Sequence, residues 1–129
     1  MHDRWRLALL MSAAVVTLAL GEAVIARGMK QAGAAGSTGW WSFATHALGN
    51  PWVIGGAFLL GFHLVLYATA MSRADLSLVM PITAASYPLG TLLARFFLHE
   101  QVNLARWIGT TVIALGVAMV AWGESRGGP

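Results

Sequence analysis

The stretch Leu7–Ala26, LALLMSAAVVTLALGEAVIA, decides the fold, because its twenty residues include a single charged side chain, that of Glu22. At about 1.5 Å of rise per residue, a helix of this length crosses the roughly 30 Å hydrocarbon core of a bilayer. A charged side chain at such a depth costs about 2.5–3.5 kcal/mol on insertion scales, and such residues by default mark proton or ion pathways. The stretch therefore predicts a membrane-spanning helix that carries a functional acid.

The composition of the whole chain is that of a membrane protein. Hydrophobic residues make up 57% of the chain and charged residues 10%, whereas a soluble domain has about 25% charged residues. We interpret residues 1–129 as a single membrane domain. The net charge of +3 comes from basic residues that lie mostly at segment ends, and the chain has no basic stripe that would indicate nucleic-acid binding. The absence of cysteine excludes disulfides and thiolate metal sites.

Four apolar segments predict an all-α bundle of four membrane-spanning helices, at about 7–26, 52–70, 76–98 and 104–123. The connections after the second and third segments are short, so neighbouring helices should pack antiparallel. Asp75 and Asn103 stand at the expected N-caps of the third and fourth helices.

The charged residues at the segment ends give no orientation in the membrane. Four basic residues lie on each predicted side, so the positive-inside rule is balanced. This balance is expected for a chain that pairs antiparallel with itself, or for one whose orientation a partner protein sets. Arg4 and Arg6 before the first segment also resemble the start of a signal peptide. Because three further apolar segments follow, we expect that segment to be retained.

The first connection, about 28–50, is predicted to be an interfacial loop. Trp40 and Trp41 are expected at the membrane interface, where tryptophan is enriched. Ser37 or Thr38 is a candidate cap for a short helix that lies in the plane of the interface. Three roles remain open for this loop: a lid over a substrate path, an anchor, or a docking site.

Glu22 is the predicted binding site for a proton or a cationic substrate. A carboxylate that binds either of the two couples export of one to uptake of the other. A snorkelling side chain or a structural pair with a basic residue are the alternatives. On the second segment, His63 and Tyr67 stand one helical turn apart and are predicted to line a cavity. No further ligand lies at metal-binding spacing from His63, so no metal is assigned.

The third segment contains Pro81 and Pro88, seven residues apart. Each proline frees a backbone carbonyl in the preceding turn, and such sites are tolerated in membranes where they line a cavity. Thr83 and Tyr87 supply hydroxyl groups at the same depth and are assigned to the substrate path. We expect the helix to bend here and to gate access; a static kink is the alternative.

The fourth segment carries Gly109, Gly116 and Gly123 on nearly one face. Small residues let helix backbones approach closely in lipid, so these glycines are the predicted seam of a dimer; packing within the same chain is the alternative. Four helices enclose little interior, and a cavity with alternating access is more easily built between two inverted copies.

The motifs resemble the drug/metabolite transporter superfamily. Glu22 followed by Met29-Lys30 is similar to the first helix of the small multidrug resistance proteins, in which this acid binds proton and cation competitively. Residues 50–89 and 99–120 resemble EamA-type four-helix proteins and aminoarabinose-lipid flippase subunits. Val79–Ile82 lacks the tryptophan of the multidrug proteins, and the flippase subunits do not depend on an acid at position 22.

The resemblance implies a multi-pass protein of the bacterial inner membrane that works as a dimer by alternating access. Its partners would be the lipid bilayer and a second copy or a related small membrane protein. The expected substrate is a small polar or cationic metabolite or a lipid-linked sugar headgroup. The alternative is an accessory subunit without transport, or a flippase subunit that acts with a partner. The chain has no nucleophile elbow or phosphate-binding loop, so neither an enzyme nor a cofactor is predicted.

Overall fold

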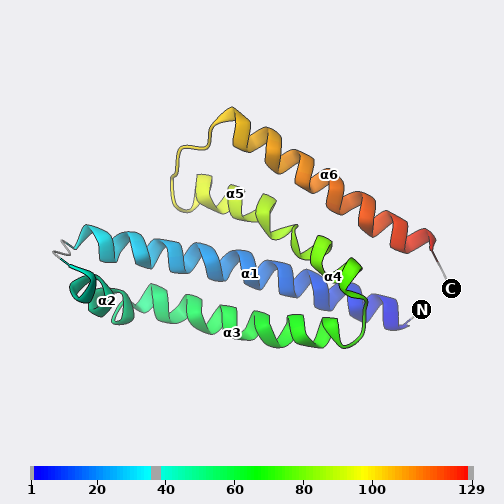
Figure 1. The fold of residues 1–129 in the computed structure, drawn as a ribbon, viewed down its shortest axis with the longest axis horizontal. Coiled ribbons are helices and arrows are strands. Elements are labelled where there is room, and N and C mark those ends of the chain that lie inside the picture. The colour runs from blue at the N-terminus through cyan, green and yellow to red at the C-terminus, as the bar shows by residue number, and fades with distance from the viewer. Residues whose placement is uncertain (1, 36–38, 128–129) are drawn as a thin grey trace.

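The structure is a computed structural model that describes residues 2–35 and 39–127. These residues form helices joined by short connections, without a strand among them. The helices are α1 (His2–Ala34), α2 (Trp40–Leu48), α3 (Pro51–Met71), α4 (Leu76–Thr83), α5 (Ser86–Phe96) and α6 (Leu104–Arg126) (Figure 1).

Four segments are long and apolar enough to cross a membrane: α1, α3, α4 together with α5, and α6. The predicted all-α fold with four membrane-spanning segments is therefore confirmed, and the chain is a multi-pass membrane protein. The N- and C-terminal ends lie at the same end of the bundle (Figure 1). An even number of crossings requires this arrangement.

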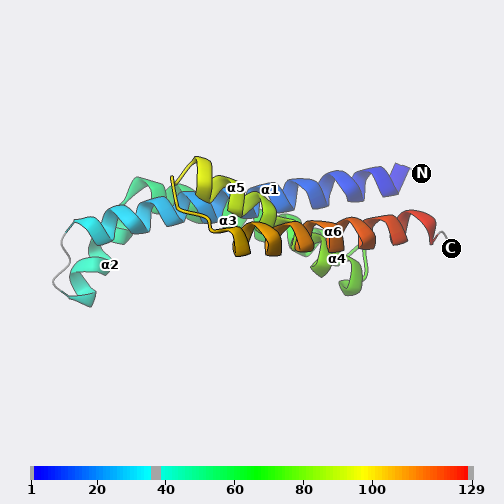
Figure 2. The ribbon, with the colours of Figure 1, turned by 90° about the horizontal axis from the view of Figure 1, so that it is seen from above.

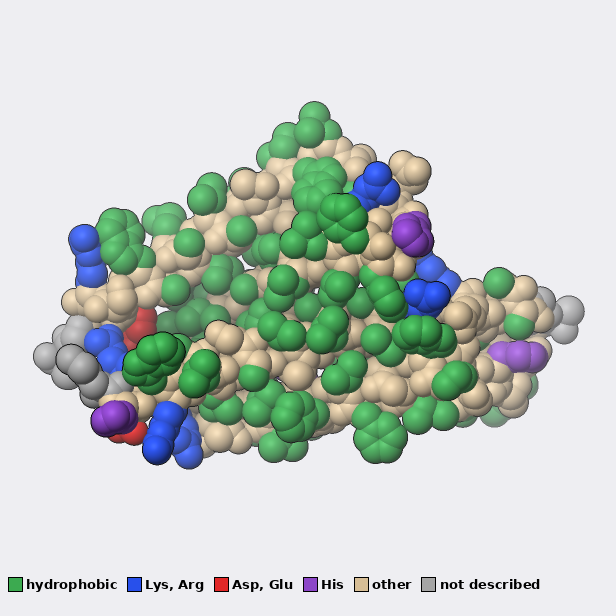
Figure 3. Space-filling view, turned by 180° about the vertical axis from the view of Figure 1, so that it is seen from behind, with side chains coloured by type: hydrophobic (Ala, Val, Ile, Leu, Met, Phe, Trp, Pro, Cys, Tyr) green, Lys and Arg blue, Asp and Glu red, His purple; other side chains and the backbone are tan. Residues whose placement is uncertain are grey.

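Helix α1 is the centre of the bundle. α3 packs antiparallel along most of its length, and α4 and α5 pack on another side of it. α6 packs on α4 and α5, and none of its described residues is buried. Seen from above, the bundle is thin (Figure 2). Hydrophobic side chains cover the middle of the face in Figure 3, and basic side chains lie toward its two ends.

The tightest packing in the fold is between α1 and α3 and depends on glycines. A Cβ atom at Gly56 would lie 2.9 Å from the backbone oxygen of Gly21 and from the backbone nitrogen of Ile25. A Cβ atom at Gly28 would lie 2.8 Å from the backbone nitrogen of Val53. Backbone atoms cannot move aside as the end of a side chain can, so both positions require glycine. This seam was not among the sequence predictions.

The helix starts agree in part with the expected capping. The side-chain oxygen of Asn103 accepts a hydrogen bond of 2.9 Å from the backbone N–H of Arg106. Asp75 stands at the N-cap of α4, but its side chain makes no capping bond. Asn50 caps α3, since its Oδ1 accepts from the backbone N–H of Trp52 at 2.9 Å.

The first connection is more helical than expected. α1 continues past the predicted end of its span, because Gly28 is packed against α3 and tertiary contact outweighs its low helix propensity. The predicted interfacial loop, about 28–50, therefore begins as helix and contains α2. The N-cap of α2 is Gly39, which makes no side-chain capping bond. Ser37 and Thr38 lie outside the described residues.

The third crossing is two helices rather than one bent helix over 76–98. Pro88 accounts for the break, because its ring lacks an N–H and collides with the carbonyl four residues earlier, that of Ala84. The N–H groups of Ala85 and Tyr87 bond instead to carbonyls three residues back, at 2.9 and 3.1 Å. These shorter turns separate α4 from α5.

Candidate functional site

An open cavity of about 350 Å³ lies where α1, α3, α4 and α5 meet. The structure brings together there all five residues that the sequence assigned to substrate or proton binding. The lining residues are Leu18, Glu22, His63, Tyr67, Met80, Thr83, Ala84, Ser86 and Tyr87. Met80 and Ala84 carry no polar side chain, so no sequence signal singled them out.

Glu22 is held on the cavity side of α1 by its two neighbours in the chain. Gly21 and Ala23 are both buried, whereas Glu22 is exposed. The one ion pair among the described residues joins Lys30 to Glu100, so Glu22 has no basic partner in the described part of the chain. The alternative of a structural ion pair at Glu22 is therefore not what the structure shows.

His63 is fixed on α3 by a contact across to α1. Its Nδ1 lies 2.7 Å from the backbone carbonyl oxygen of Ala14. A carbonyl can only accept, so Nδ1 carries the proton and Nε2 of the neutral ring is an acceptor. The ring of Tyr67 lies one turn further along, with centroids 5.7 Å apart. The pair presents an imidazole nitrogen and a phenol to the cavity.

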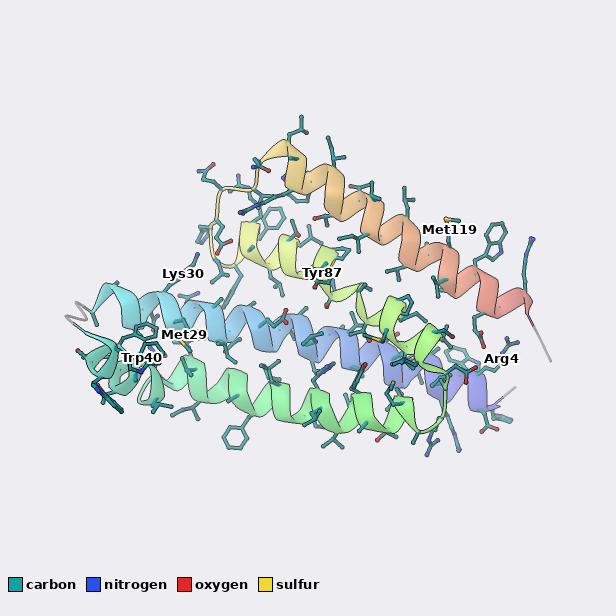
Figure 4. The ribbon with its side chains drawn as sticks, viewed as in Figure 1. Arg4, Met29, Lys30, Trp40, Tyr87 and Met119 are labelled. Carbon is teal, nitrogen blue, oxygen red and sulfur yellow. The ribbon has the colours of Figure 1, made fainter. Side chains whose placement is uncertain are left out.

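The broken third crossing supplies the hydroxyl groups. Thr83 at the end of α4 donates to the carbonyl of Val79 at 2.7 Å, which leaves its oxygen able to accept. Ser86 lines the cavity and is only 6% exposed. Tyr87 stands at the start of α5, on the side of that helix toward α1 (Figure 4). Pro81 lies inside α4, which stays helical around it.

The remaining predicted residues lie away from this cavity. A Cβ atom added to Gly109, Gly116 or Gly123 on α6 would meet no atom of another described helix within 4 Å. Packing of these glycines within the chain is thus not observed. Trp40 and Trp41 open α2 and are 73% and 80% exposed.

The charges in the cavity restrict its chemistry. Glu22 is the one acidic side chain among its lining residues, which also include the imidazole of His63. No group of three potential metal ligands occurs within residues 2–35 and 39–127. The arrangement can accept a cation at the carboxylate and hydrogen-bond several hydroxyl groups of a polar ligand.

Several known proteins similar to this chain are named as probable flippase subunits. The chain is 29% identical over 71 residues to the probable 4-amino-4-deoxy-L-arabinose-phosphoundecaprenol flippase subunit ArnE of Aeromonas salmonicida. It is 30% identical over 71 residues to the protein of the same name in Pseudomonas fluorescens. Each match covers 55% of this chain and 62% of the relative, so the chain spans less than two thirds of the length of these relatives.

An uncharacterized protein of Sinorhizobium fredii, y4nH, is 28% identical over 75 residues, which are 57% of this chain and 64% of that protein. No protein-family model and no solved structure matches the chain. The flippase-subunit relatives and the four apolar helices confirm the resemblance to small four-helix proteins of the drug/metabolite transporter type.

Proposed function

We propose that this chain is a small transporter of the bacterial inner membrane that moves a small cationic metabolite or a lipid-linked sugar headgroup across the bilayer. The cavity in which Glu22, His63 and Tyr87 meet at a break in the third crossing carries the proposal. Discontinuous helices at mid-membrane depth form the substrate sites of many transporters. The names of the relatives agree, since they denote subunits of a flippase for a lipid-linked amino sugar.

Each lining residue has a chemical role in this proposal. Glu22 binds either a proton or an amine of the substrate, because burial in a membrane disfavours an uncompensated carboxylate. His63 accepts a hydrogen bond from a substrate hydroxyl through Nε2, and Thr83 accepts another. Tyr67 and Tyr87 offer phenol groups and aromatic faces. Competition between proton and cation at Glu22 would couple the two movements.

The working unit of the proposal is a pair of chains. One chain leaves the cavity open and leaves α6 without buried residues among those described. A second half would close the cavity and alternate its access, as inverted repeats do in larger transporters. The second half is either another copy or a related small membrane protein, and the relatives are likewise named as subunits.

The test is translocation in vesicles that contain the full chain, alone or with a co-purified partner. A lipid-linked amino sugar is placed in the inner leaflet, and an amine reagent that cannot cross the membrane measures its arrival outside. The wild-type protein should speed arrival, and Glu22→Gln should abolish the effect. Asp75→Asn is the matched control, because Asp75 makes no capping bond and lies outside the cavity. Equal rates for Glu22→Gln and wild type would refute a role for Glu22.

A second candidate is an accessory subunit that does not transport. The exposure of Trp40 and Trp41 favours it, because two neighbouring exposed tryptophans suit a docking surface as well as an interfacial anchor. Such a subunit would co-purify at a fixed ratio with a larger membrane protein. Trp40→Ala with Trp41→Ala would break that association, whereas an anchor would leave the ratio unchanged.

A further inference from the structure

A second polar pocket lies at the opposite end of α5 from the cavity. It has a volume of about 350 Å³ and is formed by the last turns of α1 and the loop that follows α5. The lining residues are Arg27, Lys30, Gln31, Ala34, Phe97, Leu98 and His99. α5 has 11 residues, so the pocket is about 16 Å from the cavity along that helix. The pocket thus lies at one end of the membrane-spanning segments.

Arg27 is held in place by two aromatic rings and forms no ion pair with the described residues. Its guanidinium carbon lies 4.6 Å from the ring centroid of Trp52 and 5.0 Å from that of Phe97. The two rings meet edge to face with centroids 6.0 Å apart. No ion pair of Arg27 occurs in the described part of the chain. Its planar donors are therefore oriented and remain available to a planar or tetrahedral anion.

Lys30 adds a second cation to the same pocket. Its Nζ donates to Oε1 of Glu100 at 2.5 Å, which joins the end of α1 to the loop after α5. Figure 4 shows Lys30 on the side of α1 that faces this loop. The pair is partly exposed, with Lys30 at 53% and Glu100 at 31%, so a stronger anion can compete with Glu100 for the ammonium group.

His99 completes the polar wall of the pocket in a strained conformation. Its φ of 55° lies in the left-handed region, which residues other than glycine rarely adopt. The turn ends α5, and the N–H of Glu100 donates to the carbonyl of Ala94 at 2.8 Å. Such strain is concentrated at functional sites. A glycine would form this turn without strain.

We propose that this pocket binds the phosphate group of a lipid. Two cations and an imidazole suit a phosphate, and basic pockets between membrane helices are known to hold lipid headgroups. The apolar half of the wall, Phe97 and Leu98, and the ring of Trp52 beneath Arg27 suit the start of a lipid chain at the interface. The site is separate from the proposed transport cavity. It goes beyond the proposed function, because it would hold the phosphate group of a lipid at the membrane surface.

Calorimetric titration of the full chain in detergent tests this site. The probe is farnesyl phosphate, and farnesol, which lacks the phosphate group, is the uncharged control ligand. Arg27→Gln should weaken binding of farnesyl phosphate about tenfold, the value of one charge-assisted contact. Glu100→Gln should strengthen it about threefold, because it frees Lys30 and removes a negative charge. Arg106→Gln, an exposed cation outside the pocket, is the matched control and should change nothing.

The outcomes separate the sources of the phosphate and the two proposals. If millimolar inorganic phosphate displaces farnesyl phosphate, the pocket recognises the phosphate group alone. If it does not, the farnesyl tail also contributes to binding. Equal effects of Arg27→Gln and Arg106→Gln, or equal affinity for farnesol, would overturn the site. A gain for Glu100→Gln cannot come from misfolding. The binding assay requires no transport. Binding can therefore be observed when translocation is not, and translocation can be observed when binding is not, so failure of one proposal is distinguishable from failure of the other.

Discussion

The Nδ1 of His63 on α3 donates a hydrogen bond of 2.7 Å to the backbone carbonyl oxygen of Ala14 on α1. The bond joins the two most closely packed helices at the depth of the cavity. It also sets the tautomer, so that the neutral imidazole presents Nε2 as an acceptor. One contact thus serves packing and site chemistry together.

Replacing His63 by phenylalanine separates these two effects. The ring remains to pack on Tyr67, but the bond to Ala14 is lost, so the free energy of unfolding should fall by about 1 kcal/mol. Tyr67→Phe keeps its ring and removes a hydroxyl that bonds no described residue. Thermal unfolding in detergent should therefore shift for His63→Phe and not for Tyr67→Phe. Equal shifts would contradict the role of the Nδ1 bond.

Glu22→Gln should abolish transport and leave the protein at least as stable as the wild type. The carboxylate has no ion-pair partner among the described residues, so its removal should raise the free energy of unfolding by about 1 kcal/mol. Unfolding midpoints of both proteins, with Asp75→Asn as control, measure the change. A large loss of stability would mean that Glu22 is a structural residue.

Gly56→Ala should destabilise the bundle by about 1–3 kcal/mol, the range for overpacking. The new Cβ would lie 2.9 Å from backbone atoms of α1, which cannot yield without separating the two helices. Its neighbour Gly55 has open space around the Cβ direction, so Gly55→Ala should gain up to about 1 kcal/mol from helix propensity. Chemical unfolding in detergent followed by circular dichroism compares the two variants.

Pro88→Ala should join α4 and α5 into one helix. The alanine restores an N–H that can donate to the carbonyl of Ala84 and removes the clash that opens the turn. Ala84 and Ala85 already have right-handed helical angles, with ψ of -15° and -17°, so their solid-state NMR shifts should move from 3₁₀ towards α-helical values. Transport should fall if the break is needed. Pro51→Ala is the control, because Pro51 opens α3, where no N–H is required. Unchanged shifts would show that neighbouring helices impose the break.

Gly116→Leu should weaken the proposed pairing of chains through α6. Gly116 has no described neighbour within 4 Å of its Cβ direction, so a leucine fits the single chain and obstructs only a close helix partner. Ala114→Leu places the same side chain on another face of α6 and should leave pairing intact. Subunit counting of fluorescently labelled protein in vesicles reports both. Pairing that survives Gly116→Leu would place the seam elsewhere.

The lengths of the crossings were predictable because the bilayer core requires about 20 apolar residues for each. The residues around the cavity were predictable for a related reason: Glu22 and His63 are polar groups at depths where such groups are expensive. Tyr67 followed from its place one turn after His63. Local chemistry was sufficient at these positions.

Other features depend on how the helices are rotated and stacked. The chain has 15 glycines, and their spacing does not tell that Gly56 faces α1 while Gly116 faces outward. Whether Pro88 bends or breaks a helix depends on which contacts the neighbouring helices make with the backbone around it. The basic pocket depends on Lys30 and Glu100, which are 70 residues apart in the chain, and no local pattern predicts such a pair.

The residues on both sides of Glu22 are buried, and Gly21 and Gly28 hold α1 against α3 at two levels. The acid is therefore attached to a part of the protein in which α1 and α3 approach so closely that no side chain larger than glycine fits at these two levels. α4, α5 and α6 are joined to this pair through looser contacts and contain the one interrupted crossing. In the proposed transport cycle, α1 and α3 would form a stationary unit that carries the charge. α4, α5 and α6 would form a moving unit whose displacement decides which side of the membrane that charge faces.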